Sequence, residues 1–155
     1  MGTWRVGVLL LVALVVAGIF VARAVSHDAS GDDRSRTVVT RVVDGDTVEI
    51  ASGEHVRLIG IDTPEVGVCG FGAATARMRR MVEGRRVVLV NPDSVQDVDA
   101  YGRLLRYVDV GGEDAGLAQI RAGARARYDS RDGYDPHPRE DRYHRAEIDH
   151  PTCAR

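Results

Sequence analysis

The sequence predicts a single α+β domain that is mainly β, a small five-stranded barrel with two or three helices. Three observations predict it. Short β-branched runs recur between residues 37 and 110, helical spacing of apolar residues appears only after residue 70, and Asp and Gly residues separate these segments. Periodicity alone leaves another α+β arrangement open.

The first two β-rich runs, residues 37–43 and 47–51, flank Asp44-Gly45-Asp46. Asp and Gly tolerate left-handed backbone, so this segment predicts a hairpin turn of that kind. Residues 55–61 are expected to form the third strand.

A first helix is predicted after Gly72, because Thr75, Met78 and Val82 follow helical spacing and Gly84 can end it. The fourth and fifth strands are expected at residues 86–91 and 104–110.

Two further helices are predicted near the C-terminus. Leu117, Ile120 and Ala124 indicate a short one with Gly123 near its end, and another should run from about Pro138 to about Ile148. The expected order, with three strands, a helix, two strands and then helices, is compatible with a five-stranded barrel of the OB type.

The N-terminal segment has the pattern of an export signal. Residues 6–22 are apolar and lie between Arg5 and Arg23. This stretch is slightly long for a cleaved signal peptide and short for a membrane span, so residues 1–26 are a signal peptide or a signal anchor. Either places the rest outside the cytoplasm. The polar residues 27–36 are expected to be a flexible tether to a domain at 37–155.

Charge composition excludes several classes of site. All 21 basic residues are arginine, against 23 acidic residues, for a net charge of −2. A Walker-type phosphate loop, a Schiff-base lysine and a lysine general base are therefore absent. The acidic balance also argues against a protein that coats nucleic acid by bulk electrostatics.

Four polar clusters carry the chemical information. They are Asp44-Gly45-Asp46-Thr47, Arg57 within residues 56–61, Asp62-Thr63-Pro64-Glu65, and Asp99-Ala100-Tyr101-Gly102-Arg103. In this order and spacing, over about residues 39–128, they resemble the staphylococcal-nuclease-like (thermonuclease) family. The resemblance implies an OB-fold barrel and hydrolysis of phosphodiester bonds.

Two of these acids have the chemistry of a calcium site, because calcium prefers hard oxygen ligands. The resemblance implies that Asp46, Asp62 and the backbone oxygen of Thr63 hold Ca²⁺, with Asp44 nearby. Taken singly, Asp44 and Asp46 also fit a plain hairpin turn, and Asp62 fits a turn before Pro64.

Arginine suits a phosphodiester because its planar guanidinium can contact two oxygens at once. The resemblance implies that Arg57 and Arg103 bind the scissile phosphate and that Glu65 positions or deprotonates the attacking water. The alternatives are a strand arginine reaching to solvent, an arginine that merely follows a turn, and a solvated loop acid.

Tyr101 and Tyr128 stand where the family offers aromatic faces to a nucleotide, although Tyr128 fits core packing equally well. Residues 124–134 depart from the tyrosine-rich loop of the family's best-known pattern, which leaves the preference between DNA and RNA open.

The two cysteines, Cys69 and Cys153, predict one disulfide in an exported protein. Free thiols, or a zinc site that uses His150 with Cys153, are the alternatives.

These observations predict an exported, calcium-dependent nuclease that acts as a monomer on DNA, RNA or both. A non-catalytic OB-fold module that binds nucleic acid, and a membrane-anchored interaction domain, are the alternatives. The enzyme is favoured because every expected catalytic position carries the required residue type, which a binding module has no chemical reason to assemble.

Overall fold

The computed structural model describes residues 32–148. The predicted leader at 1–26, residues 27–31 of the predicted tether, His150 and Cys153 lie outside the described residues. In the described part of the chain, no helix combines the length and the apolar character needed to cross a membrane.

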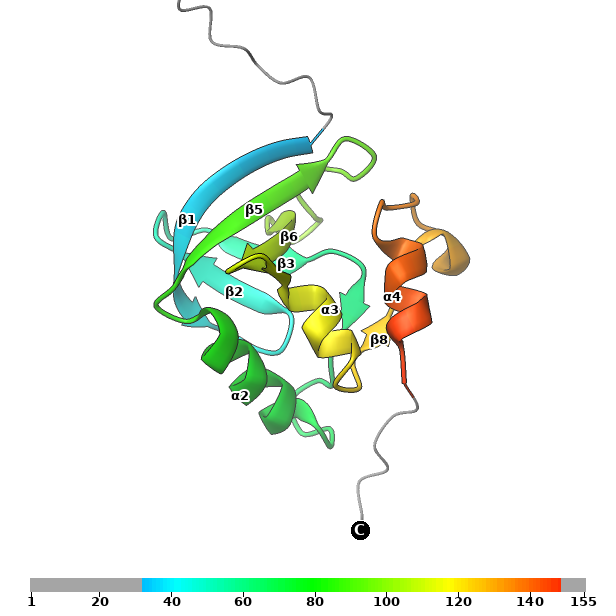
Figure 1. The fold of residues 1–155 in the computed structure, drawn as a ribbon, viewed down its shortest axis with the longest axis horizontal. Helices are drawn as coiled ribbons and strands as arrows, with labels where there is room; N and C mark the ends of the chain where they lie inside the picture. The colour runs from blue at the N-terminus through cyan, green and yellow to red at the C-terminus, as the bar shows by residue number, and fades with distance from the viewer. Residues whose placement is uncertain (1–31, 149–155) are drawn as a thin grey trace, which may run out of the picture. The chain divides into compact units, whose positions relative to one another are not determined.

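A closed five-stranded barrel forms the centre of the domain, which confirms the predicted fold class (Figure 1). Its strands neighbour one another in the order β3-β2-β1-β5-β6, and β3 pairs with β6 in parallel to close the ring. They are β1 (Asp32–Val42), β2 (Thr47–Ile50), β3 (His55–Leu58), β5 (Arg86–Pro92) and β6 (Leu104–Val110).

Strand β1 begins at Asp32, so residues 32–36 are not the flexible tether that their polar composition predicted. Residues 32–38 pair antiparallel with β5 along its whole length. The pairing uses backbone groups, and the side chains of residues 34–36 are exposed, so polar residues are compatible with this strand. An irregularity between Val39 and Arg41 then allows β1 to pair with β2.

The predicted hairpin between β1 and β2 is present, but its turn does not have the predicted left-handed backbone at Gly45, which is not among the positive-φ residues. The N–H groups of Val43 and Asp44 both donate to the carbonyl of Thr47. Glycine is needed at position 45 for close packing instead. A Cβ there would lie 2.6 Å from Oγ1 of Thr63 and 2.8 Å from Cβ of Ala74.

The predicted third strand is interrupted. After β3 the chain turns at Gly60, whose φ is +73°, and continues as the short strand β4 (Ile61–Asp62). Strand β4 pairs with β8 (Arg125–Ala126) outside the barrel. This break places the Asp62-Thr63-Pro64-Glu65 loop between the barrel and the helices.

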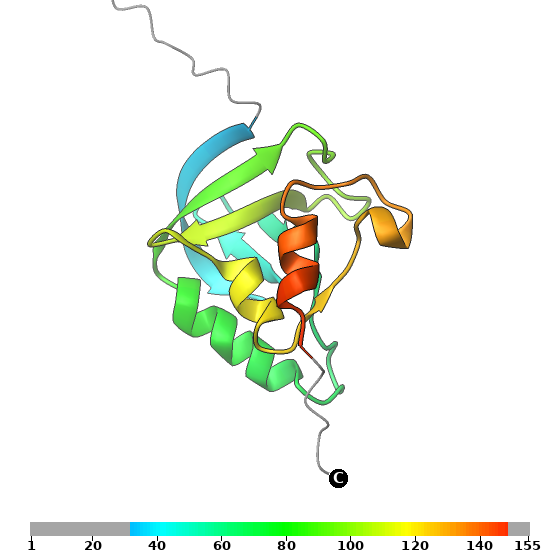
Figure 2. The same cartoon turned by 45° about the vertical axis from the view of Figure 1, so that its right-hand side comes forward.

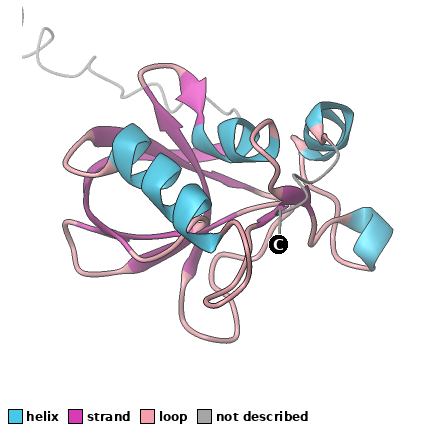
Figure 3. Cartoon of the chain, turned by 90° about the horizontal axis from the view of Figure 1, so that it is seen from below, coloured by secondary structure: helices cyan, strands magenta, loops and turns pink. Residues whose placement is uncertain are grey.

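Three helices accompany the barrel: α2 (Phe71–Val82), α3 (Ala115–Ile120) and α4 (Glu140–Ala146). Helix α3 contacts both α2 and α4, and Figure 2 shows α3 and α4 side by side. Figure 3, a view from below, shows α2 lying across the strands of the barrel. A two-residue strand, β7 (Glu113–Asp114), precedes α3, and a 3₁₀ turn, η1 (Ser130–Asp132), lies between β8 and α4.

Two helices are shorter than predicted. Helix α3 ends before Ala124, because Gly123 has a left-handed φ of +101° that a helix cannot continue through. Helix α4 begins at Glu140, two residues after Pro138, and ends at Ala146, because the next residue, Glu147, has an extended backbone.

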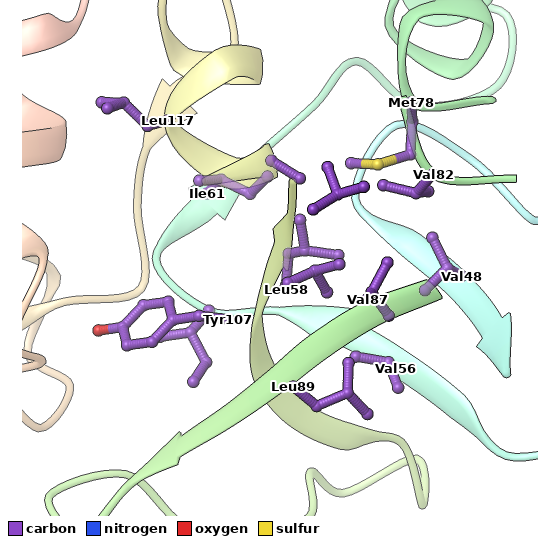
Figure 4. Packing of buried hydrophobic residues seen from close by; sticks show 14 of the residues in the cluster. Val48, Val56, Leu58, Ile61, Met78, Val82, Val87, Leu89, Tyr107 and Leu117 are labelled. Atoms are coloured by element: carbon purple, nitrogen blue, oxygen red, sulfur yellow. The ribbon is translucent and has the colours of Figure 1, made fainter. Parts of the chain in front are cut away.

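The hydrophobic core fills the barrel and the space under α2. Met78 and Val82 are fully buried, as their spacing predicted, and Figure 4 shows them directed toward Val48 and Val87 of the strands. Burial of each such side chain contributes about 1.5–3 kcal/mol relative to exposure. This packing holds α2 and the loop before it against the barrel.

Candidate active site

The first turn of the barrel and the Asp62–Glu65 loop meet through Asp46 and Thr63. Oδ2 of Asp46 accepts hydrogen bonds from the backbone N–H of Thr63, at 2.9 Å, and from its hydroxyl, at 2.8 Å. Both residues are buried. Two of the three expected metal ligands are therefore in direct contact.

Arg57 is held between two of the candidate acids. Its Nε lies 3.3 Å from Oδ1 of Asp46, and its Nη2 lies 4.0 Å from Oδ1 of Asp62. The two terminal nitrogens donate to the carbonyls of Leu58, at 2.8 Å, and Ile61, at 2.9 Å. The side chain is buried, so Arg57 does not reach out to solvent as the alternative interpretation required.

Burial disfavours the charged forms of two carboxylates near Arg57. Burial raises the pKa of Asp62, and the negative charge of Asp46 raises it further against the opposing effect of Arg57. Burial also raises the pKa of Asp44, and its repulsion from Asp46 adds to this effect. Such a group of partly dehydrated carboxylates favours a cation.

The donor set fits a small open site for a hard divalent ion. Asp46, Asp62 and the carbonyl of Thr63 offer oxygen atoms only, which is the preference of calcium and magnesium. In the described residues 32–148, no three His, Cys, Asp or Glu side chains come together as a fuller metal site. Water would have to supply the remaining ligands.

Arg103 is positioned by Asp99 of the same turn. The backbone N–H of Arg103 donates to Oδ1 of Asp99, at 2.9 Å, and its Nε donates to Oδ2, at 2.7 Å. Arg103 directly precedes β6, and the parallel pairing of β6 with β3 places Leu104 opposite Val56. The same pairing places Leu105 opposite Arg57, so the barrel closure brings Arg103 to within two residues of the strand partner of Arg57.

Tyr128 forms part of the wall around Arg57. The Cζ atom of Arg57 lies 5.4 Å from the centre of the Tyr128 ring, which packs edge to face with Tyr134 at 5.5 Å. Tyr128 is 45% exposed, so it is not a core residue. Its φ of +60° is unusual for a tyrosine, and its N–H is held by Oδ2 of Asp132 at 2.8 Å.

Tyr101 lies at the other arginine. It is 85% exposed, and the Cζ atom of Arg103 lies 5.3 Å from the centre of its ring. Each candidate phosphate-binding arginine thus has an aromatic ring next to it.

A cavity of about 1000 Å³ joins most of the predicted site. Its lining includes Asp46, Arg57, Glu65, Tyr101, Arg103 and Tyr128. Asp62 and Thr63 line a second cavity, of about 480 Å³, on the other side of their loop, and Glu65 lines both. The structure thus brings all eight predicted catalytic, metal and substrate residues to two adjoining cavities.

Sequence reasoning missed Gln119. Its side chain is 1% exposed, and Nε2 donates to the carbonyl of Gly45, at 2.7 Å, and to that of Ala74, at 2.9 Å. It therefore ties α3 and α2 to the turn that carries Asp46. A glutamine between the apolar residues Leu117 and Ile120 is the signal that could have revealed it.

Comparison with known proteins identifies the family of this chain. Residues 55–149 match the family model described as staphylococcal nuclease homologue. The chain belongs to this family. A thermonuclease from Staphylococcus intermedius is 34% identical over 137 residues, which are 79% of this chain and 80% of the relative.

Family membership makes the protein a staphylococcal nuclease homologue, an enzyme that hydrolyses phosphodiester bonds in nucleic acid.

Proposed function

We propose that this nuclease depends on Ca²⁺ and cleaves DNA, RNA or both outside the cytoplasm as a monomer. The observation that carries the proposal is the position of Arg57 between Asp46 and Asp62, with Thr63 hydrogen-bonded to Asp46. The guanidinium of Arg57 is thus held between two of the proposed cation ligands. The oxygen-only donor set and the expected extracellular setting, where calcium is plentiful, favour calcium.

Asp46, Asp62 and the backbone carbonyl of Thr63 would hold the cation. When bound, the cation supplies charge neutralisation for phosphate oxygens and lowers the pKa of a neighbouring water. Asp46 is fixed for this role by its two hydrogen bonds from Thr63. The turn and the loop therefore have to be assembled before the cation binds.

Arg57 and Arg103 bind the scissile phosphate. Three of the five N–H groups of Arg57 face Asp46 and two backbone carbonyls, which fixes the guanidinium plane and leaves two for phosphate oxygens. Fixed donors of this kind stabilise the negative charge that accumulates on the phosphate oxygens in the transition state.

Glu65 accepts the proton of the attacking water. Its side chain is exposed and lines both cavities, so it is accessible to water on either side of the catalytic loop. The water oxygen forms the new bond to phosphorus, the bond from phosphorus to the leaving oxygen breaks, and solvent supplies the proton of the released hydroxyl group. A carboxylate within reach of the water is sufficient for this step.

The proposed protein is also exported and carries a disulfide. Residues 1–26 would act as a signal peptide or as a signal anchor, and Cys69 would pair with Cys153, which lies outside the described residues. The bridge would fix the C-terminal end beside the catalytic loop, since Cys69 lines the smaller cavity. Counting thiols in the exported protein tests it, and two free thiols would contradict it.

Digestion of plasmid DNA, single-stranded DNA and RNA, each with calcium and with a chelator, tests the activity. Cleavage with calcium and loss of cleavage with chelator are expected. Equal rates in both conditions would contradict the calcium requirement. Binding of any of these nucleic acids without cleavage would favour the alternative, a module that only binds.

A further inference from the structure

The smaller cavity, of about 480 Å³, shares Asp62, Thr63 and Glu65 with the site described so far, and the rest of its lining has no role in that chemistry. It lies between the Asp62–Glu65 loop, the start of α2 and the turn from α3 to β8. Its volume falls within the range of ligand pockets, which is about 300–1000 Å³. It is large enough for a polar ligand of moderate size.

The two cavities meet at the catalytic loop. Glu65 lines both, Thr63 lines the smaller one, and its hydrogen-bond partner Asp46 lines the larger one. A polynucleotide whose phosphate lies beside Arg57 must continue in two directions. The larger cavity, with Tyr101 and Tyr128, accommodates one direction, and the smaller cavity lies across Glu65 from it.

Positive charge also lines the smaller cavity. Arg77, from α2, and Arg125, from β8, are its two basic lining residues. Arg125 is fixed next to the loop, because it is the strand partner of Asp62 in the β4–β8 pair. Nη1 of Arg77 contacts Oε1 of Gln119 at 3.5 Å, and this neutral amide does not cancel its charge.

The acids and the arginines of this cavity come from different elements, although Arg125 is the strand neighbour of Asp62. The acids Asp62 and Glu65 are on the catalytic side, and the two arginines are supplied by α2 and β8. An anion entering this space is repelled by the acids and attracted by the arginines. A phosphate group that contacts Arg77 and Arg125 would lie in a different cavity from Arg57 and Arg103, and successive phosphates of a strand likewise need separate positions.

We propose that the smaller cavity binds the nucleotide on the opposite side of the scissile bond from the tyrosines, with Arg77 and Arg125 contacting its phosphate. This inference rests on the nuclease activity and extends it to the substrate strand. The rest of the lining is mostly small or aliphatic, such as Val68, Ala73 and Ala122, and includes no aromatic ring. The cavity would therefore contact the sugar–phosphate backbone of the nucleotide rather than its base, since base stacking needs an aromatic surface.

A comparison of two substrates tests the proposal. One is a single-stranded oligonucleotide, and the other is a nucleotide aryl ester, whose leaving group carries no second phosphate. Arg125→Gln and Arg77→Gln/Arg125→Gln should lower kcat/KM for the oligonucleotide by roughly tenfold to a hundredfold more than for the ester. Arg121→Gln is the matched control, because Arg121 is an exposed arginine outside the cavity lining, and it should alter neither rate.

Salt dependence supplies a second readout. Arg125→Gln, which removes one phosphate contact, should reduce the magnitude of the slope of log kcat/KM against log salt by about 0.7 for the single-stranded oligonucleotide. The slope for the aryl ester should not change. Equal losses on both substrates, or an unchanged oligonucleotide rate in Arg125→Gln, would overturn the proposal. Arg125 is exposed, so this single variant stays interpretable if the double variant folds poorly. A wild-type protein inactive on both substrates would instead contradict the nuclease activity itself.

Discussion

Nε2 of His144 on α4 lies 2.7 Å from Oδ2 of Asp129, a carboxylate whose side chain is only 1% exposed. The other oxygen of Asp129 accepts from the N–H of Arg131. Asp129 directly follows Tyr128, the tyrosine beside Arg57. This contact therefore ties the C-terminal helix to the wall of the active-site cavity.

The first prediction concerns this pair. His144→Ala should lower the free energy of unfolding by about 1–3 kcal/mol, because it leaves a buried carboxylate without one of its hydrogen-bond partners. The same change should raise KM, since the segment that carries Tyr128 loosens. Denaturant unfolding and kinetics measure both effects. The control is His55→Ala, which removes an exposed histidine 3.7 Å from Glu49 and should change stability by less than about 0.5 kcal/mol.

A second prediction separates chemistry from folding at the catalytic loop. Glu65→Gln should reduce cleavage by roughly a hundredfold or more, with unchanged melting temperature, because Glu65 is exposed. Asp46→Ala should reduce both cleavage and stability, since it also removes the acceptor of two hydrogen bonds from Thr63. Thermal melts and cleavage rates compare them. A Glu65→Gln enzyme of near-wild-type activity would remove Glu65 from the mechanism.

A third prediction concerns removal of the cation. With calcium at a hundred times its Kd, the wild-type protein should gain about 2.7 kcal/mol of stability over the chelated protein. Asp62→Asn should lose most of this gain. In chelator it should be at least as stable as the wild type, because burial and repulsion from Asp46 already disfavour the charged form of Asp62. Melts with calcium and with chelator test both, and an equal calcium response in the variant would contradict the ligand assignment.

A fourth prediction is a pH dependence of stability at His137. Burial lowers the pKa of His137 below its ordinary value of 6.5, and its Nδ1 is hydrogen-bonded to the hydroxyl of Tyr107. Below about pH 6.5 the unfolded chain therefore binds the proton more readily than the folded one, so stability is lost as pH falls.

His137→Asn should accordingly lose less stability between pH 7 and pH 5 than the wild type does. Unfolding in denaturant at several pH values measures this slope. The control is His55→Asn, at an exposed position, which should keep the wild-type slope. Identical slopes in all three proteins would show that His137 does not carry this effect.

The fifth prediction concerns the tight turn before Asp46. Gly45→Ala should destabilise the protein by about 1–3 kcal/mol and reduce cleavage, because the new Cβ would displace Thr63 or Ala74. Gly72→Ala is the matched control. A Cβ at Gly72 meets nothing within 4 Å, and this change should cost no stability and could add up to about 1 kcal/mol. Equal effects of the two substitutions would contradict the packing argument.

The sequence predicted the parts of the structure that depend on local patterns. The strands at residues 86–91 and 104–110 and the helix with Met78 and Val82 are present, because alternation and helical spacing record which face is buried. The polar start of β1 was missed. Its side chains face solvent, and only the partner strand β5 reveals that its backbone is paired.

The same distinction applies to the site. The four polar clusters of the sequence predicted which residues form the candidate site. Their order and spacing along the chain indicated that they belong to one site. The burial of Arg57 between two acids and the hydrogen bonds from Gln119 to Gly45 and Ala74 depend on contacts between distant segments. No local pattern encodes such contacts, so their geometry required the structure.

The parallel pairing of β3 with β6 also has a consequence for how activity arises during folding. It joins Arg57 to Leu105, far apart in the chain, and closing a loop of this length carries an entropy cost that makes such contacts slow to form. This pairing also brings Arg103, two residues before Leu105, toward Arg57. We expect catalytic competence to appear late in folding, when this pairing closes the barrel, and not gradually as the separate strands and helices form.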